Sequence, residues 1–384
     1  SLKKIMKIKR KERIFICGAG ISGLTLAERI SSKLEKEVLV IEKRNHIGGN
    51  CYDFYNKDGL LVPLYGPHLF HTDSLEVWNY LSKFTDWIPY KHKVRSNVDG
   101  KKIVPIPVNI TTVNELFNKK ITNEREMDEW LKKETKCIQN PLNSEEVALS
   151  LIGKRLYELL IKNYTKKQWD IWPSELEPEV LRRLPVKKSF DDYYFSDKYQ
   201  AMPKEGYTKM FERMISNPKI KVLLNTDFFD VDTKNHDLII FTGRVDSFFR
   251  NKGIEPLQYR SLKFKFETLN KQFFQEVAVV NYPNTERFSR ITEPKRSTNQ
   301  KGYKKTTIIK EYFCWGKEPY YPIFTKENKE KYEKYAKLAK DTEKDGIYFI
   351  GRLAQYKYFD MDDAFKNALD FFNERILLKY ERKI

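Results

Sequence analysis

Cysteine is scarce in this chain, and its copies lie far apart. The 384 residues contain four cysteines, at Cys17, Cys51, Cys137 and Cys314. No two of them have the C-x-x-C spacing of a zinc site or a redox dithiol, so we expect no metal site. Few cysteines in a chain of this length also fit a reducing environment, and we predict a cytoplasmic protein.

Long apolar runs are also missing. A membrane-spanning helix needs about 20 consecutive apolar residues, and no segment approaches that length. The basic stretch from Lys3 to Arg13 could imitate the start of a signal peptide. The apolar piece Ile14–Cys17 that follows is too short and runs into glycines, so we reject this interpretation and expect no membrane span.

Acidic residues are fewer than basic ones, and the formal net charge is +18. Such a charge is typical of nucleic-acid-binding proteins. The lysines are scattered along the chain rather than gathered in one stripe. We therefore favour a lysine-rich surface with one local basic site for an anionic ligand, and expect no nucleic-acid partner.

The chain begins with a pattern typical of a parallel sheet. Ile14–Cys17 and Val38–Ile41 are uninterrupted apolar runs, and residues 21–34 between them have helical apolar spacing. This order predicts a βαβ unit with strands buried on both faces. Asn97–Gly100 predicts a hairpin turn, and Thr111–Glu115 offers a helix cap.

The rest of the chain divides by pattern. Residues 111–184 are mostly helical, with Ser144 opening one helix. Strand-like runs return at 221–224, 237–242, 259–267, 277–281 and 306–312, and the end reads as strand 346–350, turn, and helix 361–372. We predict an α/β protein: a Rossmann-type domain interrupted by a helical insertion and a mainly antiparallel β-sheet domain.

A glycine motif links the first strand to the first helix. Gly18, Gly20 and Gly23 form G-x-G-x-x-G, which permits a tight turn, a close approach to a pyrophosphate, and close helix–strand packing. The helix amino terminus, with Ile21 and Ser22, would offer amides to the phosphates. Glu42 follows the second strand and can accept the ribose hydroxyls, which disfavours NADP.

A second glycine pair, Gly48-Gly49, comes soon after Glu42. It resembles the segment that passes beside the FAD diphosphate in the glutathione-reductase and amine-oxidase class of flavoproteins. Together, the two glycine segments favour FAD over NAD.

Several longer strings resemble the UDP-galactopyranose mutases. They cover residues 65–72 (YGPHLFHT), 163–169 (NYTKKQW), 183–186 (RLPV), 192–200 (DYYFSDKYQ), 288–291 (FSRI), 310–312 (KEY), 318–322 (EPYYP) and 351–361 (GRLAQYKYFDM). The resemblance extends from about residue 13 to 375. Departures are Asp170 after Trp169, Gln355 where Glu is common, and a short loop between Glu311 and Tyr320.

The resemblance implies a reaction and its partners. It implies reversible isomerisation of UDP-galactopyranose to UDP-galactofuranose, supplying furanose for cell-surface polysaccharide, through a covalent adduct between N5 of reduced FAD and the sugar. The implied partners are a UDP-sugar, an external reductant (NAD(P)H or a reductase), and a second copy in a homodimer. Two alternatives stay open: UDP-N-acetylgalactosamine as the substrate, and an FAD-dependent oxidase of the amine-oxidase class.

The resemblance also assigns residues and units. The catalytic candidates are Arg183, Arg290, His71, His68 and Arg260. The substrate candidates are Tyr164, Trp169, Arg183, Tyr194, Arg290, Glu311, Tyr320, Tyr321 and Tyr358. The cofactor candidates are Gly18, Gly20, Ile21, Ser22, Gly23, Glu42, Lys43, Arg44, Gly49, Asn50, His68, Arg352, Asp360 and Met361. The expected units are an FAD-binding domain (1–88, 206–250, 340–384), a helical insertion (108–184) with a mobile lid (169–183), and a substrate domain (89–107, 185–205, 251–339).

Overall fold

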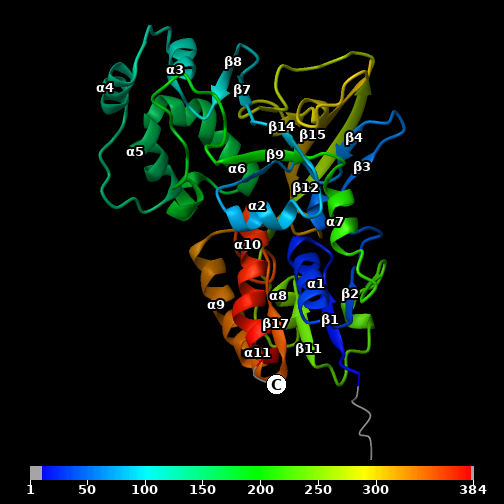
Figure 1. Cartoon of the computed structure of the whole chain (residues 1–384). Coiled ribbons are helices and arrows are strands. Elements are labelled where there is room, and N and C mark those ends of the chain that lie inside the picture. The colour runs from blue at the N-terminus through cyan, green and yellow to red at the C-terminus, as the bar shows by residue number, and fades with distance from the viewer. Residues whose placement is uncertain (1–10, 382–384) are drawn as a thin grey trace, which may run out of the picture.

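The computed structural model of the chain describes residues 11–381 and divides into a lower and an upper half (Figure 1). The ends of the expected FAD-binding domain, 1–10 and 382–384, and most of the segment Lys3–Arg13 lie outside the described residues. Within residues 11–381, none of the helices has both the length and the apolar character needed to cross a bilayer.

The lower half is built on a five-stranded parallel sheet. Its strand order is β10-β2-β1-β11-β17, with bounds Ile220–Leu223, Val38–Ile41, Ile14–Cys17, Leu238–Phe241 and Ile347–Phe349. Helices α1 (Ile21–Lys33) and α10 (Met361–Phe371) pack together on one face. The predicted βαβ unit is therefore confirmed, because apolar runs such as IFIC and VLVI are buried in a parallel sheet.

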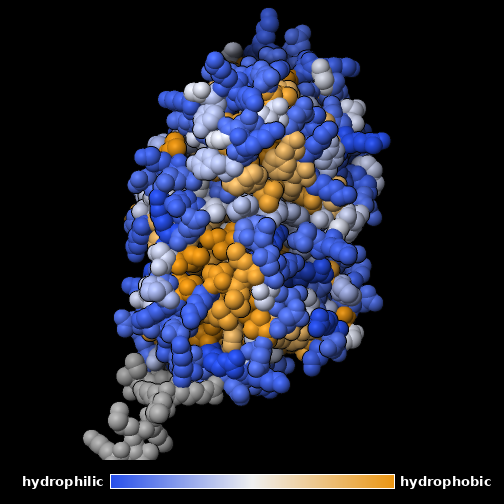
Figure 2. All heavy atoms as spheres, turned by 90° about the vertical axis from the view of Figure 1, so that its right-hand side faces the viewer, coloured by the Kyte–Doolittle hydropathy of each residue, from blue (hydrophilic) through white to orange (hydrophobic). Residues whose placement is uncertain are grey.

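The opposite face of this sheet carries an aromatic cluster that includes Phe15, Phe228 and Phe241. Its border is incompletely covered, since Leu223 and Phe229 are exposed. In the space-filling view, a broad apolar area occupies the lower half of the molecule (Figure 2).

The upper right of Figure 1 is a seven-stranded sheet. Its order is β16-β12-β15-β14-β13-β7-β8, with bounds Tyr321–Pro322, Tyr259–Leu269, Thr306–Cys314, Arg290–Thr292, Val279–Asn281, Val94–Val98 and Lys102–Ile106. All neighbours are antiparallel except β13 and β7. The hairpin turn lies at Asp99-Gly100, both with positive φ, which matches the expected Asp-Gly chemistry.

The upper left is the helical insertion. It contains α3 (Ile110–Phe117), α4 (Glu124–Glu134), α5 (Ser144–Leu156) and, after a π-helical turn (Tyr157–Ile161), α6 (Lys162–Trp169). The predicted cap at Thr111 is wrong by two residues: Asn109 caps α3 by accepting from the Thr112 amide. Asparagine is among the strongest amino-terminal caps, so it takes this place.

Short elements join the two halves. A three-stranded sheet has the order β5-β9-β6, with bounds Phe70–Thr72, Tyr199–Pro203 and Trp87–Pro89. The remaining elements are β3 (Asp53–Tyr55), β4 (Leu61–Pro63), α2 (Leu75–Leu81), α7 (Tyr207–Met214), α8 (Val245–Phe248), α9 (Lys326–Asp341) and α11 (Leu378–Glu381). Sequence analysis did not predict the three-stranded sheet, because three-residue strands are too short to show alternation.

The fold class is as expected: a Rossmann-type α/β unit, a helical insertion and a mainly antiparallel sheet. The parallel sheet takes strands from the beginning, middle and end of the chain. The exact domain boundaries stay predictions.

Candidate active site

The glycine motif forms a tight turn between β1 and α1. Gly18 has a φ of +101°, and a Cβ on it would lie 2.2 Å from the Oγ1 atom of Thr242. A Cβ on Gly23 would lie 1.9 Å from the Gly18 carbonyl oxygen. Only glycine fits both positions. No side chain caps α1 and no acid lies in its first turn, so its amides suit an anionic group.

The second glycine pair packs directly on the first motif. The Gly48 amide donates to the Ala19 carbonyl over 2.8 Å, and a Cβ on Gly49 would lie 2.9 Å from the Gly20 Cα. Gly351 joins from the end of the chain, since a Cβ there would lie 3.1 Å from the Ser22 Oγ. Three separate segments thus meet at the amino terminus of α1.

Glu42 and its neighbours form a polar rim beside this turn. Glu42 accepts from the Ala19 amide (2.8 Å) and from the Arg44 amide (2.9 Å). Arg44 donates to the Asn50 Oδ1 over 3.1 Å. Lys43 and Arg44 both approach the carboxylate of Glu318. The predicted cofactor candidates at 42–50 therefore lie together at one end of the parallel sheet.

An ion pair forms the centre of the neighbouring sheet face. Arg290 on β14 lies opposite Glu311 on β15, and its guanidinium donates twice to the carboxylate, over 2.9 and 3.0 Å. Glu311 is fully buried. Burial alone would lower the pKa of Arg290, but Glu311 together with Tyr164 and Tyr321 outweighs it, and the pKa rises well above its ordinary value. The arginine is permanently charged.

Three candidate tyrosines lie near this pair: Tyr164, Tyr194 and Tyr321. A fourth, Tyr358, is half exposed and lies beside Arg352 and Asp360. Burial raises the pKa of each phenol, and the charge of Arg290 opposes the rise in the first three. Arg352 lies over the rings of Tyr321 and Tyr358, 5.4 Å from each centroid. The phenols are neutral and can donate to phosphate oxygens.

The adjacent Tyr320 and Tyr321 differ in what they contact. Tyr321 joins the Arg290 cluster, whereas Tyr320 packs against Tyr65 and Phe264 at centroid distances of 6.2 and 6.1 Å. Tyr320 directly precedes β16, which begins at Tyr321, and adjacent side chains of an extended segment point to opposite sides. Of this pair, only Tyr321 lies beside Arg290.

The segment 65–72, which contains His68 and His71, passes beside Glu311. Gly66 has a φ of +90°, and a Cβ on it would lie 3.2 Å from the Glu311 Oε2. His68 places Nδ1 2.9 Å from the Gly66 carbonyl oxygen. Burial, helped by the charges of Arg352 and Arg290, lowers the pKa of His68 to about 4, although the hydrogen bond to Gly66 opposes the shift. His68 is therefore a neutral imidazole. Its pKa responds to both Arg352, a cofactor candidate, and Arg290, a substrate candidate.

His71 lies farther along the same loop. Its ring stacks on Phe195 at 3.6 Å, and its Nδ1 lies 3.1 Å from the Asp197 Oδ2. Sequence analysis missed a third histidine, His92, which is 5% exposed and lies near both Arg290 and His71. Burial lowers the pKa of His92 to about 3. No motif marked it; its one signal is its place two residues from Tyr90, whose hydroxyl contacts its Nδ1.

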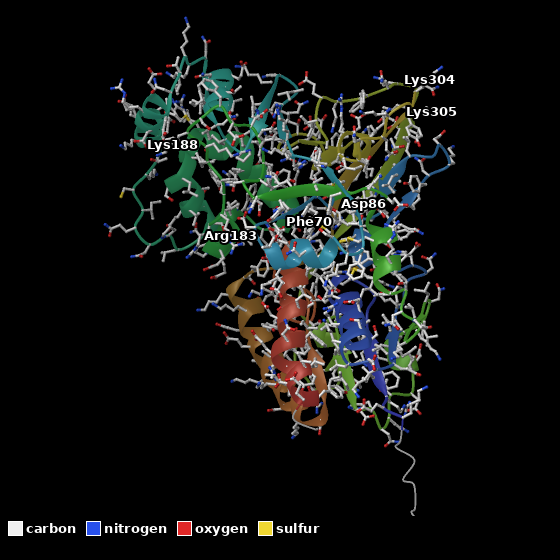
Figure 3. All side chains as sticks on the ribbon, in the orientation of Figure 1. Phe70, Asp86, Arg183, Lys188, Lys304 and Lys305 are labelled. Atoms are coloured by element: carbon white, nitrogen blue, oxygen red, sulfur yellow. The ribbon has the colours of Figure 1, made fainter. Side chains whose placement is uncertain are left out.

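The lid candidates lie apart from Arg290. Arg183 is exposed and, within residues 11–381, has no hydrogen-bond or ion-pair partner. Figure 3 shows it at the edge of the helical insertion that faces the lower half. Trp169 is buried against Leu176 and Ile323, so it belongs to a small core. The structure does not bring Arg183 to the diphosphate candidates.

Arg260 also has a different setting from the one expected. It is buried, and it donates to the carbonyl oxygens of Gln168 (2.9 Å) and Lys167 (3.2 Å) at the end of α6. Its guanidinium lies 4.7 Å from the Trp315 ring centroid. These contacts tie β12 to the start of the predicted lid.

The remaining cofactor candidates lie at the start of α10 and beside Tyr320. Asp360 caps α10 and Met361 is its first residue. Arg352 donates to the Tyr320 carbonyl oxygen over 3.1 Å, while its buried Nε has no partner among the described residues. The glycine cradle, the uncapped helix and this unpaired Nε suit a dinucleotide with phosphate groups and polar ring atoms.

Comparison with known families agrees with this geometry. The family described as "NAD(P)-binding Rossmann-like domain" matches residues 16–84, and the family described as "UDP-galactopyranose mutase" matches residues 159–358. A protein of Klebsiella pneumoniae named "Probable UDP-galactopyranose mutase" is 37% identical, with 93% of each chain covered. The chain belongs to the UDP-galactopyranose mutase family.

Two other relatives also align over most of their length, but their names give different substrates. The UDP-galactopyranose mutase of Mycoplasma genitalium is 35% identical over 91% of each chain. The dTDP-fucopyranose mutase of Escherichia coli is also 35% identical, over 93% of this chain and 97% of its own. A crystal structure of reduced UDP-galactopyranose mutase superposes with a TM-score of 0.77 at 16% identity, covering 96% and 94% of the two chains. That likeness supports the fold.

Proposed function

We propose that the chain is a flavin-dependent mutase that interconverts UDP-galactopyranose and UDP-galactofuranose. The observation that carries this proposal is the pairing of the partly exposed Arg290 with the buried Glu311, with Tyr164, Tyr194 and Tyr321 beside it, in a member of this family. A fixed guanidinium with phenol donors suits a diphosphate.

FAD is the cofactor that fits the glycine motif at the amino terminus of α1. Its diphosphate would lie at the amino terminus of α1, with its ribose at Glu42 and its ring toward His68, Arg352 and the start of α10. Reduced FAD would supply the electron pair that displaces UDP from the anomeric carbon. Because the reaction has no net oxidation, an external reductant, NAD(P)H or a reductase, would be needed only to prime the flavin.

The residues around Arg290 would bind and orient the UDP-sugar. Arg290, Tyr321 and Tyr358 would take the diphosphate, while Tyr164 and Tyr194 would flank the uracil. Arg183 would complete the diphosphate clamp only when the lid 169–183 closes. Closure would exclude water while the sugar is separated from UDP.

The neutral imidazole of His68 has a positioning role in this proposal. With a pKa near 4 it carries no charge at neutral pH, so it can orient polar groups without attracting the diphosphate away from Arg290. His71, bound to Asp197, would support the loop from its other end.

The wider setting of the enzyme follows from the same family. We propose that the protein works in the cytoplasm as a homodimer, with the three units bounded as expected from the sequence. Its furanose product would feed cell-surface polysaccharide.

A second candidate substrate deserves a direct test. The dTDP-fucopyranose mutase is as similar to this chain as the M. genitalium UDP-galactopyranose mutase. The two substrates differ in the methyl group on the base, in the ribose 2′-hydroxyl and at the sugar C6, so the same diphosphate site could serve either. The comparisons favour neither UDP-N-acetylgalactosamine nor an oxidase.

The deciding experiment is turnover by the purified yellow protein. UDP-galactofuranose and dTDP-fucofuranose are offered separately, with and without dithionite, and the products are separated by chromatography. Conversion of the UDP-sugar, only after reduction and at the higher kcat/KM, supports the proposal. Failure with both sugars, with FAD bound, would refute it.

A variant pair makes this test specific to the site. Arg290→Ala should lose at least about a hundredfold in kcat/KM, because a charged donor to the diphosphate is lost. Arg287→Ala, an exposed arginine three residues away, is the matched control and should keep turnover. Both should keep bound flavin.

A further inference from the structure

Two adjacent phenylalanines are exposed at the tip of the loop between β12 and β13. Phe273 and Phe274 are 38% and 39% exposed, and polar residues flank them in the sequence N-K-Q-F-F-Q-E from 270 to 276. Single exposed apolar residues are ordinary on protein surfaces, but a pair at one loop tip indicates a contact surface.

Buried hydrogen bonds fix the loop tip in place. Glu293 is fully buried, and its carboxylate accepts from the amides of Phe274 and Gln275, each over 2.9 Å. The Thr306 hydroxyl donates to the same carboxylate over 2.6 Å. The exposed rings are thus presented by an ordered backbone, which lowers the entropy cost of binding.

Cations surround the two rings. The Arg296 guanidinium lies 3.7 Å from the Phe273 ring centroid, and the Lys295 ammonium lies 4.7 Å from it. The Lys271 ammonium lies 5.5 Å from the Phe274 centroid. Lys295 itself is buried and donates to the carbonyl oxygens of Tyr303 and Lys305, so the exposed rings share the loop surface with the cations of Lys271 and Arg296.

A cavity of about 290 Å³ opens beside Phe273. Its lining has three cations and no carboxylate: Gln272, Phe273, Lys295, Arg296, Asn299, Gln300, Lys301, Gly302 and Tyr303. This is the lower end of the size range of small-molecule pockets, too small for a nucleotide sugar and suited to a phosphate headgroup.

We propose that this tip, defined by Lys271, Phe273, Phe274, Arg296 and Lys301, docks on an anionic phospholipid bilayer. Paired aromatic side chains bordered by cations are the combination that binds the headgroup region of a negatively charged membrane. A soluble anion would use the cavity but would gain nothing from the exposed rings.

The place of the tip leaves the mutase site accessible. Lys304 and Lys305, which follow the lining residue Tyr303, lie at the upper right of Figure 3, whereas Arg183 lies at the left, on the helical insertion. A membrane against the tip would therefore not cover the lid. The proposal is independent of which sugar the enzyme uses.

The test is flotation of the flavin-loaded protein with lipid vesicles. One set is phosphatidylcholine alone, and the other contains about a third phosphatidylglycerol. We expect binding to the anionic vesicles, little binding to the neutral ones, and a steep loss with added salt.

Two variants separate the apolar and charged contributions. The double variant Phe273→Ala/Phe274→Ala should bind at least about tenfold more weakly, because it removes the apolar area. Lys271→Ala/Lys301→Ala should bind about twenty-five-fold more weakly, at about fivefold per cation. The matched controls are Phe190→Ala, whose ring is 55% exposed elsewhere, and the exposed Lys252→Ala; both should bind normally.

Each other outcome would overturn the proposal. These are equal binding to both vesicle types, unchanged binding by both double variants, displacement from vesicles by inorganic phosphate at constant ionic strength, or stronger binding to single-stranded RNA than to anionic vesicles. Turnover and melting temperature of the variants should match the parent protein, which shows that a loss of binding is not a loss of folding.

Discussion

At the scale of single residues, Arg290 and Glu311 stabilise each other's charge inside the protein. A buried carboxylate without a partner would be strongly unfavourable, and so would a buried guanidinium. Their double hydrogen bond compensates both and fixes the direction of the guanidinium. The remaining donor capacity of Arg290 is what a diphosphate would use.

Glu311→Gln should show how much the charge of Glu311, apart from its volume, contributes to stability. The amide keeps the volume but leaves Arg290 uncompensated, so the free energy of unfolding should fall by roughly 3 kcal/mol, measured by urea denaturation. The exposed Glu276→Gln is the control and should stay within about 0.5 kcal/mol. Equal stability of both variants would contradict the account of the pair.

His92 should make stability depend on pH. Burial lowers the folded-state pKa of His92 to about 3, from 6.5. Between these values the unfolded chain binds a proton that the folded protein does not, so stability falls as pH drops below about 6.5. From pH 7 to 5, His92 should account for a loss of about 1–2 kcal/mol. Urea denaturation of His92→Asn should show a shallower decline, and an unchanged slope would refute this.

At the scale of elements, the junction of α6 with the proposed lid (169–183) is clamped by β12 and by Trp315, which directly follows β15. Asp170 ends α6 with a φ of +56° and accepts from the Trp315 Nε1 over 2.8 Å. Arg260 donates to the last carbonyl groups of α6. This arrangement gives Arg260 a positioning role, because it acts on the lid through α6.

Trp315→Phe should loosen this junction. The ring over Arg260 remains, but the hydrogen bond to Asp170 is lost, at about 1 kcal/mol. We expect KM for the nucleotide sugar to rise about fivefold and proteolytic cleavage within 170–183 to become faster. Trp172→Phe, a partly exposed tryptophan of the lid itself, should change neither. An unchanged KM and cleavage rate in Trp315→Phe would contradict the clamp.

At the scale of the whole molecule, the cofactor cradle is assembled from distant parts of the chain. The motif at 18–23, the pair Gly48-Gly49 and Gly351 meet at one helix terminus. A ligand bound there would hold together the beginning and the end of the chain. It would also stabilise only the folded state.

Removal of the flavin should therefore lower the melting temperature. At a flavin concentration a hundred times Kd, binding adds about 2.7 kcal/mol to the free energy of unfolding. Calorimetry of the flavin-free protein should show the lower transition, and added FAD should restore it while NADP should not. A melting temperature indifferent to FAD would contradict the assigned cradle.

Much of the fold could be predicted because its signals are local. The strands Ile14–Cys17 and Val38–Ile41 are continuous apolar runs, and the glycines between them fix the turn by their missing Cβ atoms. The short strands β5, β6 and β9 could not be predicted, since pairing between distant segments rather than their own pattern creates them.

The sequence by itself determined the glycine cradle, the βαβ unit around it and the family, because these depend on residues adjacent in the chain. Only the tertiary structure decided which of Tyr320 and Tyr321 lies beside Arg290, that His92 is buried near them, and that Arg183 lies apart. These depend on which faces of separate strands and loops come together. That packing is a property of the whole chain, and no short segment encodes it.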